Sequence, residues 1–203
     1  SHKRTALNYK YSGLVNKGNT CYVNALLQCL NSLTLFTTKL SDVKQGASCL
    51  VTSCQKVLDN SKVSSTPVDP SAFLLILKIS IERSMNRQFD IFSQLDVPEV
   101  LEYLLGEISV LSVFVSSIFD VTVTTSIFCD SCNEENVTVE VSPILQLGIT
   151  SLLQNSINEF LQPEHLPIES GRFCYFCNKV QPTTIERYVT KCGSYLIIHL
   201  KRF

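Results

Sequence analysis

Hydrophobic residues recur at helical spacing through the first hundred residues of the chain. Beginning at Thr20, apolar side chains lie three and four residues apart as far as Leu33, which predicts an amphipathic helix. The same kind of pattern predicts further helices over 43–58, 71–83 and 96–108. Residues 59–70 are rich in Ser, Thr and Asn and are expected to form a loop.

Capping residues support the starts of three of these helices. The hydroxyl of Thr20 is suited to accept a hydrogen bond from an unpaired backbone N–H of the first helix. Asp69 and Pro70 supply an N-cap and a first-turn proline for the helix over 71–83. Asp96 and Glu99 have the spacing of a capping box, which predicts the start of the last of the four.

The periodicity changes after Val110. Residues 113–128 are rich in Val, Ile, Phe and Thr and in part alternate between apolar and polar, which predicts a strand. Residues 136–147 and 183–200 have the same character, the second interrupted near Gly193, and one short helix is expected between them over 152–161. A helical half followed by a strand-rich half predicts an α+β fold with two subdomains.

Composition and charge exclude several classes of protein. The 203 residues are 45% hydrophobic and 17% charged, which excludes disorder for most of the chain. The net charge of −1 provides no broad cationic field, so nucleic acid is not expected as a partner. The longest apolar stretches, 72–81 and 100–119, are too short or carry acidic residues that are costly in lipid, so no membrane contact is expected either.

Nine cysteines in a chain too large to need disulfide bonds indicate a reducing compartment, the cytoplasm or the nucleus. No apolar leader and therefore no targeting signal is visible at the start of the sequence. Four of the cysteines form two Cys-x-x-Cys pairs: Cys129 with Cys132, and Cys174 with Cys177. Four thiolates are the ligand set of a closed structural Zn²⁺ site, which leaves no open position for catalysis. The alternative is a set of free thiols.

Cys21 is the candidate nucleophile. It follows a loop that contains Gly18 and Asn19, residues that tolerate the backbone angles of a tight turn, and it lies in the first turn of the first predicted helix. Backbone N–H groups at a helix start stabilise a thiolate, the form that attacks carbonyl groups. Asn16 is placed to donate to an oxyanion at the same site. The alternative is a small cysteine buried in the core.

Three segments of the sequence resemble the ubiquitin-specific proteases, a papain-like family of deubiquitinating cysteine proteases. Residues 13–30, GLVNKGNTCYVNALLQCL, resemble the family's cysteine box. Residues 94–101, QLDVPEVL, are similar to its Gln-Gln-Asp-Ala-x-Glu-Phe-Leu segment, with departures at Leu95 and at 98–100. Residues 196–203, LIIHLKRF, are similar to its Leu-x-Ile-His-Leu-Lys-Arg-Phe strand.

The resemblance assigns roles to residues of the helical half. It implies that Cys21 is the nucleophile and Asn16 the oxyanion-hole donor. It also implies that Asp96 belongs to the surface that binds the extended ubiquitin tail, whose arginines need carboxylate partners. Gln28 is a weaker candidate for the same contact. The alternatives are a plain helix cap for Asp96 and a solvated polar position for Gln28.

The resemblance further implies a papain-like fold with named subdomains. Residues 1–112 are expected to form a helical thumb, 113–192 zinc-bearing fingers, and 193–203 the truncated first strand of a palm. His199 lies in the block where the family's histidine is not the general base. The catalytic His and its Asp or Asn partner come later in the family, so we expect this segment alone to be inactive. A downstream segment or a second chain would complete the palm.

The expected function is hydrolysis of isopeptide or peptide bonds after the C-terminal glycine of ubiquitin, through a thioester at Cys21. Ubiquitin and ubiquitinated proteins are the expected partners. One alternative is a catalytically dead ubiquitin-binding or scaffold module. Another, a zinc-ribbon module for nucleic acid, is opposed by the near-neutral charge.

Overall fold

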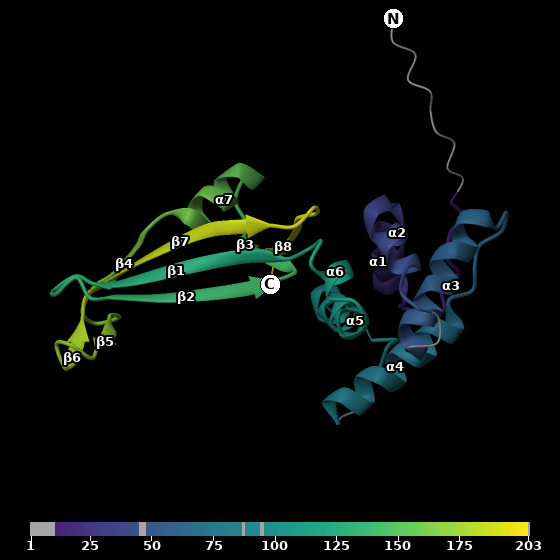
Figure 1. Cartoon of the computed structure of the whole chain (residues 1–203), viewed down its shortest axis with the longest axis horizontal. Coiled ribbons are helices and arrows are strands. Elements are labelled where there is room, and N and C mark those ends of the chain that lie inside the picture. The colour runs from purple at the N-terminus through teal and green to yellow at the C-terminus, as the bar shows by residue number, and fades with distance from the viewer. Residues whose placement is uncertain (1–10, 45–47, 87, 94–95, 203) are drawn as a thin grey trace, which may run out of the picture. The chain divides into compact units, whose positions relative to one another are not determined.

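The computed structural model describes residues 11–44, 48–86, 88–93 and 96–202. The chain divides into two compact units, a helical unit over Ser1–Ser116 and a strand-rich unit over Ser117–Phe203 (Figure 1). The mixed helix and sheet content confirms the predicted α+β class.

The helical unit contains six helices in its described part. They are α1 (Cys21–Ser32), α2 (Thr34–Ser41), α3 (Cys49–Val63), α4 (Ser71–Met85), α5 (Val97–Leu111) and α6 (Val113–Ser116). The apolar faces that the periodicity predicts point inward and form one core. Its most deeply buried side chains include Leu27, Phe36, Leu50, Phe73, Leu77, Leu104 and Ile108.

The ends of these helices differ from the sequence-based expectation. The helix predicted over 43–58 begins only at Cys49, where the Ser48 hydroxyl accepts a hydrogen bond from the Val51 amide at 3.4 Å. Pro70 takes the N-cap position of α4, and the Asp69 carboxylate accepts from the Ser71 amide at 2.9 Å. The expectation that 113–128 is one strand was wrong at its start, because 113–116 form α6 and Val115 is buried.

The strand-rich unit is built on an antiparallel sheet with the strand order β2-β1-β7-β4 (Figure 1). The unit also contains two separate strand pairs, an antiparallel β5–β6 hairpin and a parallel β3–β8 pair. Its helix is α7 (Leu153–Leu161). The strands are β1 (Val121–Cys129), β2 (Glu135–Ser142), β3 (Ile144–Gly148), β4 (Glu164–Leu166), β5 (Arg172–Cys174), β6 (Lys179–Gln181), β7 (Thr183–Cys192) and β8 (Ile197–Lys201).

Two breaks divide the longer predicted strands. The stretch 136–147 is split by Pro143 into β2 and β3, which belong to different sheets. The predicted break near Gly193 is confirmed and has a steric cause. A Cβ atom at Gly193 would lie 2.3 Å from the backbone oxygen of Ile118, and the Gly193 amide donates to Asp120 O at 2.7 Å.

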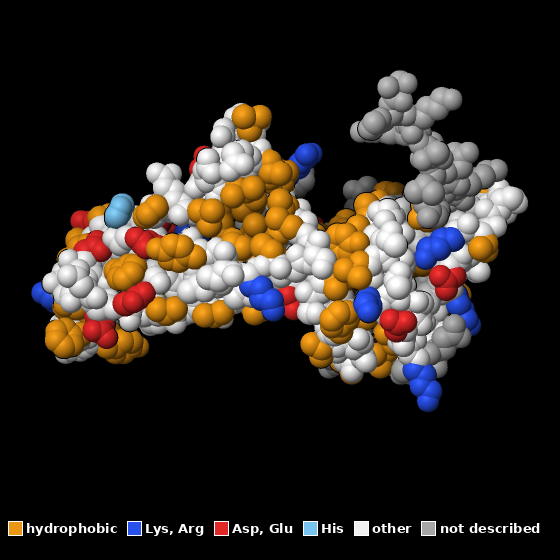
Figure 2. Space-filling view, turned by 45° about the horizontal axis from the view of Figure 1, so that its top comes forward, with side chains coloured by type: hydrophobic (Ala, Val, Ile, Leu, Met, Phe, Trp, Pro, Cys, Tyr) orange, Lys and Arg blue, Asp and Glu red, His pale blue; other side chains and the backbone are white. Residues whose placement is uncertain are grey.

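Hydrophobic side chains remain exposed on the strand-rich unit. Figure 2 shows them gathered in the region of α7, β3 and β8, where Ile149, Leu152, Leu153 and Leu196 are each about half exposed or more. Within the described part of the chain, no helix has the length and apolar character needed to cross a membrane.

Candidate active site and metal centre

The loop before Cys21 is attached to the segment that precedes α4. Leu14 and Val68 form an isolated parallel β-bridge. The Val15 amide donates to Val68 O and the Val68 amide donates to Gly13 O, both at 2.9 Å. The backbone on the N-terminal side of the nucleophile is therefore fixed to the rest of the helical unit.

An ion pair reinforces this attachment. Lys17 Nζ lies 2.6 Å from Asp69 Oδ2, and the Asp69 carboxylate also accepts from the amide and hydroxyl of Ser71. The hydrogen bonds from Lys17 and Ser71 lower the pKa of Asp69 to about 2. The carboxylate consequently stays ionised across the physiological range.

A tight turn brings the chain from this attachment to α1. Gly18 and Asn19 both have left-handed backbone conformations, with φ of 88° and 47°. Asn16 Oδ1 closes the turn by accepting from the Gly18 amide at 3.2 Å and from the Thr20 hydroxyl at 3.0 Å. The Thr20 hydroxyl in turn accepts from the Lys17 amide, so it bonds within the loop and does not cap α1, contrary to prediction.

These bonds decide how the Asn16 amide is oriented. Backbone N–H donates and cannot accept, so the oxygen of the Asn16 side chain must face the turn. Its Nδ2 group therefore faces away from the turn, and the side chain as a whole is exposed. This orientation suits a donor to a developing oxyanion, the predicted role of Asn16.

Cys21 is the first residue of α1, and its side chain is exposed. This disagrees with the alternative of a buried core cysteine. Cys54 illustrates that alternative, because it is fully buried and desolvation raises its pKa to about 12. The first-turn amide groups of α1 lie at the same end of the helix as the Cys21 side chain.

Two side chains that the sequence analysis did not single out hold α1 in place. Asn24 is buried and donates from Nδ2 to Val15 O at 3.2 Å, joining the helix to the loop before it. The Tyr22 hydroxyl donates to Ile91 O at 3.0 Å, and burial raises its pKa to about 12. The sequence did contain a signal for Asn24, because it is a polar residue on the apolar face of the predicted helix.

The two residues predicted to contact the ubiquitin tail, Gln28 and Asp96, are both exposed. Gln28 lies seven residues after Cys21 on α1, which places the two on the same side of the helix. Asp96 occupies the N-cap position of α5 with extended backbone, but its side chain makes no capping hydrogen bond, so that part of the capping-box prediction was wrong. Gln94 and Leu95 lie outside the described residues.

The four predicted metal ligands converge at one end of the main sheet. Cys129 ends β1 and Cys174 ends β5, while Cys132 and Cys177 lie in the turns that follow. Their Sγ atoms all lie within 4.8 Å of one another, with 3.9 Å between Cys129 and Cys177 and 3.6 Å between Cys132 and Cys174. Tetrahedral Zn²⁺ with Zn–S bonds of about 2.3 Å requires S···S separations of about 3.8 Å. The cluster therefore fits zinc, and a disulfide would need about 2.05 Å.

Both Cys-x-x-Cys turns end in the same way. Asn133 follows Cys132 and Asn178 follows Cys177, and both asparagines are left-handed, with φ of 59° and 53°. This repeated turn directs backbone amides at the sulfur atoms. The Cys177 amide, for example, donates to Cys174 Sγ at 3.4 Å.

The thiols of the cluster differ in acidity. Burial opposes ionisation of Cys129, but the backbone amides of Ser131 and Cys132 outweigh it and lower its pKa to about 7. The pKa of Cys132 rises to about 12 because burial and the neighbouring thiols outweigh the Glu134 amide. A bound cation would hold all four thiols in the ionised form, because metal ligation requires thiolates.

Comparisons with known proteins give the family. Ubiquitin carboxyl-terminal hydrolase 12 of Salmo salar is 27% identical over 239 residues, covering 97% of this chain and 62% of that protein. Ubiquitin carboxyl-terminal hydrolase 4 of Candida glabrata is 26% identical over 259 residues, covering 94% of this chain and 28% of that protein. The chain thus spans less than two thirds of the length of these relatives.

Among solved structures, the SAGA Ubp8/Sgf11/Sus1/Sgf73 DUB module bound to ubiquitin aldehyde matches with a TM-score of 0.73 and 22% identity. The match covers 96% of this chain and 48% of that one, and it confirms the predicted fold. The family model described as ubiquitin carboxyl-terminal hydrolase matches residues 12–203. The chain therefore belongs to the ubiquitin carboxyl-terminal hydrolases and, within them, to the ubiquitin-specific proteases.

Proposed function

We propose that this chain is the thumb and fingers of an enzyme that hydrolyses the bond after the C-terminal glycine of ubiquitin, with Cys21 as the nucleophile. The observation that carries the proposal is the exposed Cys21 at the start of α1, behind a loop fixed by Asn16 and Thr20, in a chain of this family. An exposed thiol on a rigid element is what nucleophilic catalysis needs.

The reaction follows from these groups. The Cys21 thiolate attacks the carbonyl carbon of the glycine, and an S–C bond forms while the carbonyl oxygen becomes an oxyanion. Asn16 Nδ2 donates to that oxyanion, and its own Oδ1 stays anchored in the turn. The C–N bond then breaks, and the leaving amine takes a proton from a general acid. Water hydrolyses the resulting thioester and releases the Cys21 thiolate.

The general base is expected from a palm segment beyond these residues. Among the described residues of the helical unit there is no histidine. His165 pairs through Nδ1 with the Thr184 hydroxyl at 2.9 Å, beside the cysteine cluster. His199 lies in β8, in the motif where the family does not use it as the base.

The partly exposed strand β8 of the parallel β3–β8 pair supports the idea of further palm elements. Parallel strands are usually covered on both faces, whereas residues 197–200 of β8 are only half-buried. Exposed Ile149, Leu152 and Leu196 surround them. We propose that a downstream segment or a second chain packs here and brings the catalytic His with its Asp or Asn partner.

We propose that Cys129, Cys132, Cys174 and Cys177 hold one structural Zn²⁺. When bound, zinc supplies four strong bonds that join the β1–β2 turn to the β5–β6 turn. The site has no free coordination position, so it takes no part in the hydrolysis. Nine free cysteines also support the cytoplasm or the nucleus as the location.

Ubiquitin is the proposed partner. One solved structure that matches this chain has ubiquitin aldehyde bound, and Asp96 and Gln28 are exposed for contact with the ubiquitin tail. Asp96 supplies the carboxylate that the tail's arginines need, while Gln28 lies on the side of α1 that carries Cys21.

Ubiquitin with a C-terminal alkylating group tests the proposal. With the palm segment supplied, intact mass should show one ubiquitin adduct, which Cys21→Ser abolishes and Cys29→Ser retains, because both cysteines are exposed on α1 but only Cys21 is at its start. Binding of ubiquitin without any adduct would favour the catalytically dead binding module instead. That alternative draws support from the absence of a histidine among the described residues of the helical unit.

A further inference from the structure

We propose that the free edge of β2 binds an extended segment of another protein by strand addition, with one aromatic side chain of that segment anchored in a pocket beside the four-cysteine cluster. The proposal does not depend on the catalytic role of Cys21. β2 lies at one edge of the four-stranded sheet and pairs with β1 alone among the described strands. Its other side carries backbone groups suited to a further strand.

The register identifies those backbone groups. The Cys129 amide donates to Glu134 O at 2.9 Å, and hydrogen-bonded pairs alternate along an antiparallel ladder. Asn136, Thr138 and Glu140 therefore direct their N–H and C=O groups at β1. The intervening residues, Val137, Val139 and Val141, direct theirs outward from the sheet.

The side chains of this edge are apolar and exposed. Val137, Val139 and Val141 share one face of the sheet and are 51%, 64% and 59% exposed. Edge strands of soluble proteins are usually protected by lysine, proline, a bulge or a covering element. β2 contains neither lysine nor proline, and its pairing with β1 runs without a bulge. It is therefore a ready template for strand pairing.

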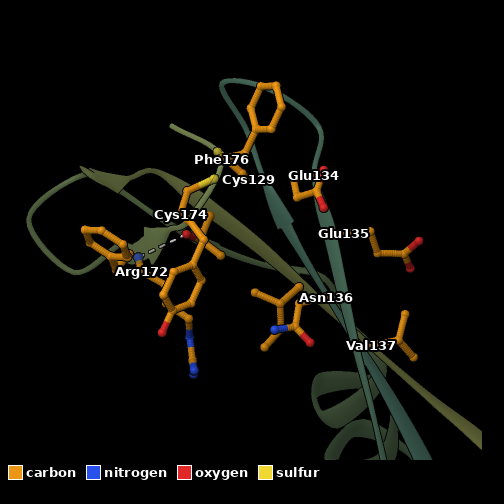
Figure 3. Close-up of a pocket in the computed structure, with 12 residues that line it drawn as sticks. Cys129, Glu134, Glu135, Asn136, Val137, Arg172, Cys174 and Phe176 are labelled. Carbon is orange, nitrogen blue, oxygen red and sulfur yellow. Dashed lines mark hydrogen bonds between the residues drawn. The ribbon is translucent and has the colours of Figure 1, made fainter. Parts of the chain in front are cut away.

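A pocket of about 540 Å³ opens on the opposite face, at the N-terminal end of β2. It is lined by residues of β1, β2 and the β5 region, among them Ile127, Asn136, Arg172, Phe173, Tyr175 and Phe176. Figure 3 shows Asn136 on the Arg172 side of the strand, while Glu135 and Val137 project to the other side. A residue of an added strand that lies opposite Asn136 would thus enter this pocket.

The pocket lining favours an aromatic occupant. Phe173 and Tyr175 meet edge to face with ring centroids 5.3 Å apart, and Tyr175 and Phe176 are 88% and 77% exposed. Aromatic rings prefer such edge and face contacts with one another, and the Arg172 guanidinium adds a cation for a ring face. The volume is within the range of ligand pockets and exceeds that of a single side chain.

Charge selects the flanking residue of the partner. Glu134, Glu135 and Glu140 lie along this edge, and β2 carries no Lys or Arg. A basic residue is the favourable neighbour directly opposite Glu140. In an antiparallel partner, the expected order is β-branched, basic, β-branched, polar, β-branched, aromatic, with the aromatic opposite Asn136.

A second copy of this chain fits less well. Two β2 strands that pair with Val139 opposite Val139 form a valine ladder, but they place Ser142 opposite Asn136 and Thr138 opposite Glu140. The pocket then stays without an aromatic ring and the carboxylate without a cation. The observations favour a segment of a different protein.

A labelled peptide with the core Val-Lys-Val-Thr-Val-Phe and polar flanks tests the proposal by fluorescence anisotropy against the 203-residue chain. We expect saturable binding, weakened at least tenfold by Val139→Pro and less than twofold by Val139→Thr. Proline at 139 removes an outward N–H and leaves the β1 ladder intact, which circular dichroism should verify. Glu140→Lys and a peptide with Ala in place of Phe should each weaken binding about tenfold.

Three results would overturn the proposal. The first is no saturable binding to the folded chain. The second is equal binding to the folded Val139→Pro variant or to the Ala peptide. The third is a dimer in sedimentation that Val139→Pro dissociates while the peptide does not bind, because a second copy would then be the occupant of the edge.

Discussion

At the scale of single residues, the oxygen and the nitrogen of the Asn16 side-chain amide have separate roles in the proposed mechanism. Asn16 Oδ1 holds the turn through Gly18 and Thr20, and this contact fixes the direction of Nδ2. A side chain pre-oriented in this way needs no rearrangement when charge develops on the substrate, which is how an oxyanion donor is effective. In the proposed mechanism, loop stability and catalysis therefore depend on different atoms of Asn16 and can be separated by substitution.

Asn16→Asp in the chain with its palm segment should slow the chemical step by roughly 10²-fold, because the acceptor oxygen is kept and the N–H donor is lost. Asn16→Ala should slow the chemical step to the same extent and, in addition, cost about 1 to 2 kcal/mol of stability, since the hydroxyl of the buried Thr20 loses its acceptor. Single-turnover kinetics and denaturant unfolding measure the two effects. An unchanged rate in Asn16→Asp would reduce this residue to a loop-shaping role.

The Lys17–Asp69 pair makes the stability of the helical unit depend on pH. The pKa of Asp69 is about 2 in the folded chain, below its ordinary value of 3.8, so folding favours the ionised form. Its contribution is complete above about pH 4 and is lost as the pH falls through 2. Asp69→Asn should therefore lower stability at pH 7, and the difference from the unmodified chain should shrink toward pH 2 in denaturant titrations followed at 222 nm.

At the scale of elements, the sequence predicted what depends on local periodicity. α1, α4, α5, α7 and β7 agree with their patterns, because a buried face at regular spacing is a local property. The spacing of the two Cys-x-x-Cys pairs also predicted that four cysteines lie together, while the role of Cys21 stays a prediction. The three-residue strands β4, β5 and β6 were missed, because such short segments form only through partners distant in the sequence.

Hydrogen bonds within the preceding loop replaced the predicted cap of α1. The Thr20 hydroxyl donates to Asn16 Oδ1 and accepts from the Lys17 amide, and it makes no capping bond to α1. The hydrogen bonds from Asn24 to Val15 and from Tyr22 to Ile91 place α1 beside segments that the sequence alone did not connect to it. The convergence of the four cysteines was thus predictable from the sequence, whereas the hydrogen bonds that hold α1 in place were not.

Cys132→Ser should remove the metal from the strand-rich unit and loosen the β5–β6 hairpin, because the remaining three thiolates no longer close a tetrahedral site. Metal analysis should find one zinc per chain before the substitution and none after it. Cys192→Ser is the matched control, since Cys192 is exposed at the end of β7 and lies outside the cluster. Zinc-free protein with unchanged fingers would contradict a structural metal.

Gly193→Ala should destabilise the strand-rich unit by about 1 to 3 kcal/mol, the usual range for forced overlap. Its Cβ would meet Ile118 O at 2.3 Å and the Phe119 amide at 3.0 Å, both of them backbone atoms with little freedom to move. Gly148→Ala is the control, because a Cβ there has no heavy atom within 4 Å. Equal unfolding midpoints for the two variants would show that the break between β7 and β8 can move.

At the scale of the whole molecule, the chain presents the candidate nucleophile Cys21 in one compact unit and the four-cysteine cluster in the other. The cysteine cluster lies where β1 and β5 end. The exposed hydrophobic region of the same unit lies around β3, β8 and α7. Such an exposed apolar region is typical of an interaction surface. Family membership and the greater length of the relatives agree with a palm that packs there.

Supplying that palm should create activity, whereas we predict that the 203-residue chain alone is inactive. We expect no cleavage of a ubiquitin–fluorophore conjugate by the chain alone, because a thiol without an oriented imidazole lacks the base for both steps. Activity of the completed enzyme should disappear in Cys21→Ser and persist in His199→Ala and His165→Ala, with circular dichroism to confirm that β8 is intact. Cleavage by the chain alone that His199→Ala abolishes would instead make His199 the base.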